Sequence, residues 1–96
     1  MTKIEKVHRD YRAALLRYLP RREEAALHVG YKLGRTAVSD GLSILDLVQV
    51  HHEVFLEVLG DTLPEDVTLV STAASEFLLE VLATYDMAHR GFLPRS

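Results

Sequence analysis

The sequence predicts an all-α domain, a four-helix bundle-like fold that we expect to form a homodimer. Along four segments, apolar residues recur every three or four positions, which is the spacing of one helical face. Proline or glycine separates successive segments, and the links are short, about two to five residues, which favours antiparallel neighbours. At 96 residues the chain fits one domain with a small core, and association would stabilise such a core.

The first two helices are predicted from a cap and a proline. We expect one helix over residues 2–19, because Thr2 and Glu5 have capping-box spacing and Pro20 disfavours helical backbone before it. We expect the next helix over residues 22–39, where an Asp-Gly pair stops it with a glycine suited to a left-handed C-cap. The apolar faces expected on the two helices are Ile4, Val7, Tyr11, Ala14 and Tyr18, then Ala26, Leu27, Gly30, Leu33, Ala37 and Val38.

The last two helices are predicted in the same way. Ser43 is a good N-cap with Asp46 three residues on, and the apolar spacing continues over residues 44–59. Pro64 suits the first position of a final helix over residues 64–91. Their expected apolar faces are Ile44, Leu47, Val48, His51, Val54, Phe55, Val58 and Leu59, then Val67, Val70, Ala74, Phe77, Leu78, Val81, Tyr85 and Ala88, with Leu79 and Leu82 on the flank.

Composition excludes several classes of function. The net charge is −3 and the one basic pair, Arg21-Arg22, is followed directly by Glu23-Glu24, so we expect no nucleic-acid binding. No apolar stretch is long enough to span a membrane, because charged residues such as Glu80 interrupt them, and the charged N-terminus is not a signal peptide. The chain has no cysteine, which fits a reducing compartment, so we expect a soluble cytoplasmic protein.

No motif for catalysis, a cofactor or a metal is present. Nucleotide-binding glycine loops and a nucleophile elbow are absent, and His51-His52-Glu53 lacks the second histidine of a zinc hydrolase. His51 falls on an apolar face and is expected to be a hydrogen-bonded core residue. The alternative to a purely interacting domain is a histidine phosphotransfer or dimerisation bundle of a two-component system, with His28 or His52 as the phosphorylated residue.

Ala26, Gly30 and Gly34 recur every fourth residue of the second predicted helix. Glycine inside a helix costs about 1 kcal/mol relative to alanine, so two on one line indicate that another backbone approaches closely there. Tight core packing explains such a line, and so does a helix crossing at a dimer interface. We expect the line to form the homodimer interface.

A set of short motifs runs in order along nearly the whole chain. They are Tyr11-x-x-x-Leu15-x-Arg17-Tyr18, Glu24-x-x-Leu27, Lys32-x-x-Arg35, Asp46-x-Val48-x-Val50-His51, Leu63-Pro64-Glu65-Asp66, Phe77-Leu78-Leu79-Glu80-Val81 and Tyr85-x-Met87-Ala88. No single motif is diagnostic, but the ordered set resembles the N-terminal regulatory domain of the RsbU-type stress-response serine phosphatases.

This resemblance implies a non-catalytic, homodimeric domain over residues 1–91, with residues 92–96 beginning a linker. In the resembled family the domain binds an RsbT-like switch kinase, and binding activates a C-terminal metal-dependent serine phosphatase of the PP2C class. That enzyme dephosphorylates an anti-sigma-factor antagonist in a bacterial stress-signalling pathway.

The resemblance also implies a kinase-docking surface on the second and fourth helices. Carried over position by position, its residues are Glu24, His28, Leu79 and Ala83. His28 stands where the family has a larger aromatic residue, and Ala83 where it has a larger aliphatic one, so the partner is expected to differ or to bind more weakly.

Overall fold

The computed structural model describes residues 1–91, and this part of the chain contains α-helices, one 3-10 turn and no strand. The helices are α1 (Lys3–Tyr18), α2 (Glu24–Ser39), α3 (Ile44–Gly60) and α4 (Val67–His89), with the 3-10 turn η1 (Pro64–Asp66) directly before α4. The predicted all-α fold with four helices is confirmed. Residues 92–96, expected to begin a linker, lie outside the described residues.

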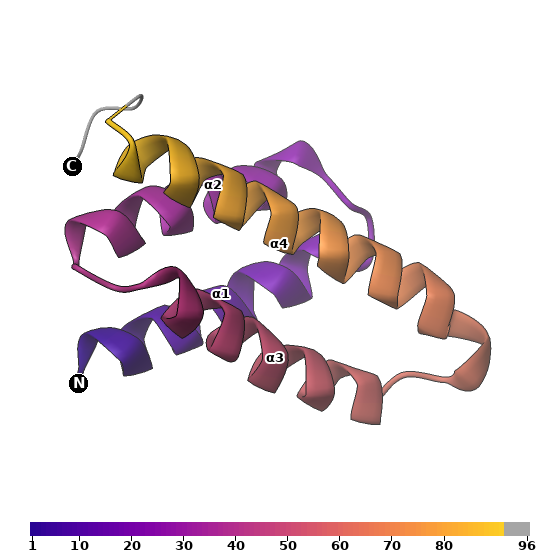
Figure 1. Cartoon of the computed structure of the whole chain (residues 1–96). Helices are drawn as coiled ribbons and strands as arrows, with labels where there is room; N and C mark the ends of the chain where they lie inside the picture. The colour runs from indigo at the N-terminus through magenta and orange to yellow at the C-terminus, as the bar shows by residue number, and fades with distance from the viewer. Residues whose placement is uncertain (92–96) are drawn as a thin grey trace.

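The four helices form two antiparallel hairpins, α1 with α2 and α3 with α4 (Figure 1). Packing of the hairpins against each other sets α1 alongside α3 and α2 alongside α4, each pair running in the same direction (Figure 1). The most extensive contact in the molecule is between α2 and α4, which are not consecutive in the sequence. Short links therefore predicted the hairpins, and the pairing between hairpins follows from side-chain packing.

Both predicted capping boxes form. The amide of Glu5 donates to the Thr2 hydroxyl at 3.1 Å, and the amide of Thr2 donates to the Glu5 carboxylate at 2.9 Å. Ser43 and Asp46 repeat the arrangement at the start of α3 with distances of 3.1 and 2.9 Å. Each box satisfies amides that the first turn of a helix leaves without intrahelical partners, so the starts of α1 and α3 are locally determined.

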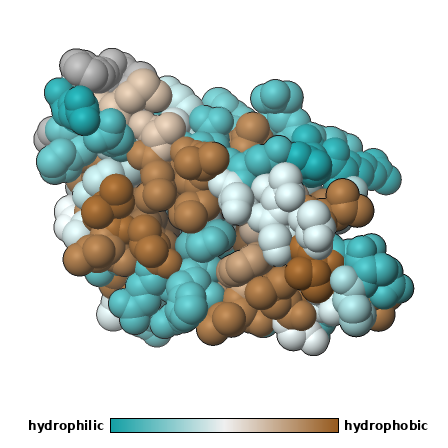
Figure 2. All heavy atoms as spheres, turned by 45° about the vertical axis from the view of Figure 1, so that its right-hand side comes forward, coloured by the Kyte–Doolittle hydropathy of each residue, from teal (hydrophilic) through white to brown (hydrophobic). Residues whose placement is uncertain are grey.

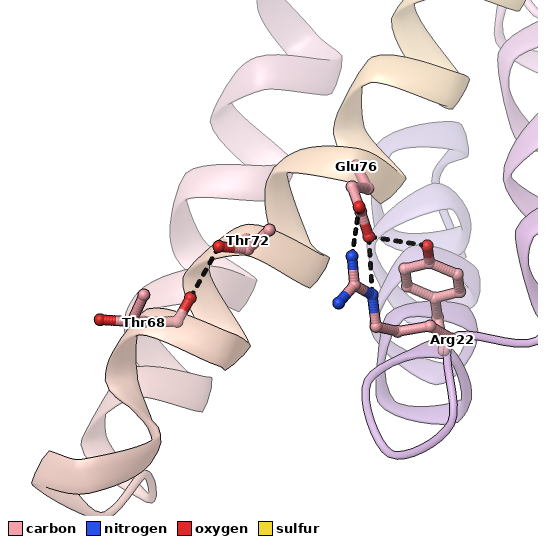
Figure 3. A network of polar contacts seen from close by, with 5 residues as sticks. Arg22, Thr68, Thr72 and Glu76 are labelled. Atoms are coloured by element: carbon pink, nitrogen blue, oxygen red, sulfur yellow. Dashed lines mark hydrogen bonds and ion pairs between the residues drawn. The ribbon is translucent and has the colours of Figure 1, made fainter.

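The link between α1 and α2 differs from the prediction. The second helix begins at Glu24 rather than at residue 22, because Arg22 adopts a left-handed backbone with φ of 52°. The Arg22 guanidinium contacts the Glu76 carboxylate of α4, with Nε 2.8 Å from Oε1, and the Tyr18 hydroxyl donates to the same oxygen at 3.0 Å (Figure 3). The link is thereby tied to the middle of α4, a contact between residues far apart in sequence.

The core lies between the two hairpins. Its largest fully buried side chains include Tyr11, Leu15, Leu47, Val54, Phe77 and Val81. The Tyr11 and Phe77 rings are nearly perpendicular with centroids 5.2 Å apart, an edge-to-face arrangement that aromatic pairs favour.

Four residues that the apolar spacing assigned to the core are exposed instead. They are Ile4, Ile44, Val48 and Val67, each with about two fifths of its surface accessible. Ile4, Ile44 and Val67 lie in the first turn of a helix, and Val48 lies on the side of α3 away from its buried residues, so helical spacing alone did not show which side a neighbouring helix would cover.

The span from Pro64 to His89 is long and apolar enough, by length and composition alone, to cross a membrane. The judgement that no stretch reaches this length is therefore corrected. In the structure this span packs Phe77, Val81 and Ala88 into the core, although only 28% of its apolar window is buried. One such helix is weak evidence for a membrane span, because core helices meet the same criteria.

Candidate partner-binding surface

The four positions carried over from the resemblance all lie on the outside of the molecule. Glu24 and His28 are exposed and one turn apart on α2. On α4, Leu79 has 66% of its surface exposed, and Ala83, one turn further on, is also exposed. Phe77, two residues before Leu79, is fully buried, so α4 turns its apolar face inward and still presents a large leucine to solvent.

The packing of α2 on α4 places these positions on neighbouring helices. A Cβ on Gly30 would lie 3.1 Å from Phe77 and 3.3 Å from Val81, on either side of Leu79 in the sequence. Gly34 contacts α4 one turn further along, beside Ala83. Glu24 and His28 therefore precede the level of Leu79 along the two parallel helices. All four side chains are exposed.

Sequence reasoning missed a row of side chains next to His28. The rings of His28 and Tyr31 stack with centroids 5.4 Å apart, and the Arg35 guanidinium lies 5.6 Å from the centre of the Tyr31 ring. Positions 28, 31 and 35 fall on one side of a helix, so the three- and four-residue spacing of these aromatic and cationic residues could have predicted the row from the sequence. Tyrosine and arginine often dominate the binding energy of protein interfaces.

The small-residue line does not have the location that we expected. Ala26, Gly30 and Gly34 are all buried, and both glycines pack against α4 of the same chain. The close helix approach is thus real, but it occurs inside one domain. The assignment of these residues to a homodimer interface is corrected, because α4 already occupies the space that a second copy would need.

A different apolar surface is open to solvent on α3. Leu45 is 74% exposed, Val48 40% and Leu56 55%, and the exposed His52 lies among them. Figure 2 shows one face of the molecule, on which hydrophobic residues gather in two large brown groups separated by hydrophilic residues. So many exposed leucine and valine side chains on one helix of a small domain are typical of an interaction surface. We call Leu45, Val48, His52 and Leu56 the α3 outer face.

The histidines do not form a metal centre. Residues 1–91 contain no group of three or more histidine, aspartate and glutamate side chains placed to hold a metal ion. His51 is a hydrogen-bonded residue at the core, as predicted: its Nδ1 lies 2.7 Å from the hydroxyl of buried Tyr11. Burial lowers the pKa of His51 and raises that of Tyr11, so both groups favour their neutral forms.

The comparisons with known proteins agree with the resemblance. A family model described as "Phosphoserine phosphatase RsbU, N-terminal domain" matches residues 9–88, which is most of the chain. Comparisons with curated proteins and with solved structures gave no match. The matched range contains all four helices except for the first residues of α1 and the last of α4. The chain therefore belongs to the family of RsbU N-terminal domains, whose role is regulatory.

Proposed function

We propose that this domain binds an RsbT-like switch kinase and, through that complex, activates a C-terminal metal-dependent serine phosphatase. The observation that carries the proposal is the exposure of Leu79 on α4, beside the helix that presents Glu24 and His28. A large apolar side chain surrounded by small and ionisable groups suits a docking contact, because burying it against a partner removes apolar surface from water.

The row next to His28 supports the same surface. Tyr31 and Arg35 extend the α2 side of the surface by two turns, and their stacked arrangement presents ring and guanidinium groups together. Glu24 supplies a carboxylate for a basic residue of the kinase. The surface therefore combines an apolar contact with charged groups at its edge, as in ordinary protein interfaces.

The test compares two leucines of nearly equal exposure on α4. Leu79→Asn removes the proposed contact, whereas Leu69→Asn changes a residue that is 64% exposed and lies nearly three turns earlier. Binding of a purified RsbT-like kinase is measured by calorimetry, together with the melting temperature of each variant. Glu24→Lys is measured as a second variant on α2.

We expect Leu79→Asn to weaken kinase binding by about tenfold or more with the melting temperature preserved, and Leu69→Asn to leave binding unchanged. Equal losses from both leucine variants would contradict the placement of the surface. The placement would also be contradicted if Leu79→Asn unfolds the domain while Glu24→Lys still binds the kinase as the wild type does.

We further propose that the domain is a homodimer joined through the α3 outer face. Its exposed Leu45, Val48 and Leu56 are the apolar residues that a second copy would cover. We expect sedimentation of the wild-type chain to give the mass of a dimer and Leu56→Lys to give a folded monomer, with Leu69→Lys remaining dimeric. A wild-type monomer at tens of micromolar, or a dimer that survives Leu56→Lys, would contradict this arrangement.

A further inference from the structure

The α1–α2 hairpin carries an open groove on its outer side. The groove has a volume of about 380 Å³, and its floor is formed by Ala13, Ala14, Val29 and Leu33. All of its lining residues belong to α1 and α2, so it opens away from the α3–α4 hairpin. It shares no residue with the proposed kinase surface, although Lys32 lies one turn after His28 on α2.

Cationic side chains surround this apolar floor. Lys6 and Arg17 lie toward the two ends on α1, and Lys32 lies on α2. Among the side chains of residues 1–91, none of these three has an acidic partner within ion-pair distance. The one carboxylate of the lining, Asp10, is paired with Arg9 at 3.1 Å. The groove therefore offers three unpaired positive charges to a ligand.

The charge of the whole chain is also unevenly distributed, with the positive charge concentrated in the part that forms the α1–α2 hairpin. Residues 1–41 contain nine lysines and arginines against five acidic residues, whereas residues 42–96 contain two against nine. Formal charges of about +4 and −7 follow for the two parts, although the chain as a whole is acidic. An acidic partner is thus attracted to the α1–α2 hairpin and repelled by the opposite side of the molecule, which fixes where it docks.

The shape of the groove selects a helix. Lys6 and Arg17 are three turns apart, about 16 Å along the axis of α1 at 1.5 Å per residue. The floor between them is apolar and follows the seam of two antiparallel helices. A third helix lying along this seam would bury an apolar stripe on the floor and place carboxylates of its flanks beside the three cations.

We propose that this groove binds an acidic amphipathic helix of a partner protein. The helix spans about three turns, its leucine-type residues contact Ala13, Val29 and Leu33, and its aspartates or glutamates pair with Lys6, Arg17 and Lys32. The helix contacts no residue of the proposed kinase surface, so its binding does not depend on Leu79.

The test uses a designed peptide of about 18 residues, long enough to be helical, with leucines on one face and glutamates on both flanks. Its binding to the purified 96-residue chain is followed by fluorescence anisotropy at low and high salt. A peptide of the same composition in scrambled order controls for charge alone. Lys32→Glu reverses a charge of the groove, and Arg90→Glu makes the same change of net charge at the end of α4.

We expect the amphipathic peptide to bind at least about tenfold more tightly than the scrambled one, and less tightly at high salt. Lys32→Glu weakens binding by about tenfold, Ala13→Leu weakens it by filling the floor, and Arg90→Glu and Leu79→Asn leave it within about twofold. Circular dichroism checks that each variant is folded.

Three results would overturn the proposal. Equal binding of the amphipathic and the scrambled peptide would mean that charge alone is recognised. Equal losses of peptide binding in Lys32→Glu and Arg90→Glu would lead to the same conclusion. A fall in the sedimentation mass of Lys32→Glu relative to wild type would assign the groove to a second copy of the chain. Failure of Leu79→Asn to bind kinase leaves this proposal standing, because the peptide is measured without kinase.

Discussion

Gly34 of α2 lies directly against Thr84 of α4, so closely that position 34 has room for a hydrogen atom only. A Cβ there would overlap the Thr84 hydroxyl and the Val81 carbonyl oxygen and would stand 2.8 Å from the Tyr85 amide nitrogen. The Thr84 hydroxyl is itself held by the carbonyls of Glu80 and Val81 at 3.0 and 3.1 Å. The two helices thus meet almost backbone to backbone, which sets the distance between the hairpins.

Gly34→Ala is expected to destabilise the domain. Two of the three atoms nearest the new Cβ belong to the backbone of α4, which cannot move aside without separating the helices, so we expect a loss of about 1–3 kcal/mol in the free energy of unfolding. Gly60→Ala is the matched control, because its Cβ position is open, and it is expected to gain up to about 1 kcal/mol. Urea denaturation measures both. An equal response of the two variants would show that helix propensity, and not the α2–α4 contact, dominates.

Phe77 and Leu79 are two residues apart and should respond in opposite ways. Phe77 is fully buried against Tyr11, so Phe77→Ala is expected to lower the free energy of unfolding by about 3–5 kcal/mol. Leu79 is 66% exposed, so Leu79→Asn should change the free energy of unfolding by no more than about 0.5 kcal/mol. Thermal unfolding of the two variants checks this. A large loss from Leu79→Asn would place Leu79 in a buried interface.

The stability of the domain is expected to fall below about pH 6.5 through His51. Burial lowers the pKa of His51 in the folded chain below its ordinary value of 6.5. The unfolded chain therefore binds a proton at this position before the folded chain does, so the free energy of unfolding decreases as the pH falls. Well above pH 6.5 both states are neutral at this position and the contribution of His51 is constant.

His51→Gln isolates this effect, because glutamine keeps an acceptor for the Tyr11 hydroxyl and does not titrate. Urea midpoints measured from about pH 8 to about pH 5 should decline less steeply in His51→Gln than in the wild type. The neighbouring His52 adds to the lowering of the His51 pKa after burial, so the decline of His52→Gln should lie between those of the wild type and His51→Gln. Identical profiles for all three proteins would contradict the prediction.

Arg22 combines a left-handed backbone with a side chain that contacts Glu76, and two substitutions separate these features. Arg22→Ala removes the guanidinium and keeps a side chain that disfavours this backbone, whereas Arg22→Gly removes the guanidinium and tolerates the backbone. We expect Arg22→Gly to melt at a higher temperature than Arg22→Ala. The melting temperature of the wild type should exceed that of Arg22→Ala by less at high salt, because Arg22 and Glu76 are both partly exposed and salt screens their attraction. A salt-independent difference would point to the backbone alone.

The start of α2 is shifted by two residues, and a 3-10 turn takes the place of the first three residues predicted for the last helix. The other helix bounds followed from the sequence to within one or two residues, because the interactions that start and stop a helix are local. Thr2 and Glu5 are three residues apart, as are Ser43 and Asp46, so their reciprocal hydrogen bonds need nothing from the rest of the chain. Gly41 takes the left-handed backbone expected at the end of α2, with φ of 76°. The RsbU-type motifs were also readable, since they depend on residue order alone.

Only the tertiary structure decided which surfaces meet. The line of Ala26, Gly30 and Gly34 signals a close approach, but nothing in its spacing states whether the approaching helix belongs to the same chain or to a second copy. The contact of Arg22 with Glu76 joins residues 54 positions apart, and the groove on the α1–α2 hairpin exists because both helices of the other hairpin pack on its opposite side. Such choices result from competition among all the apolar faces of the chain for burial, a property of the packed molecule and of no single segment.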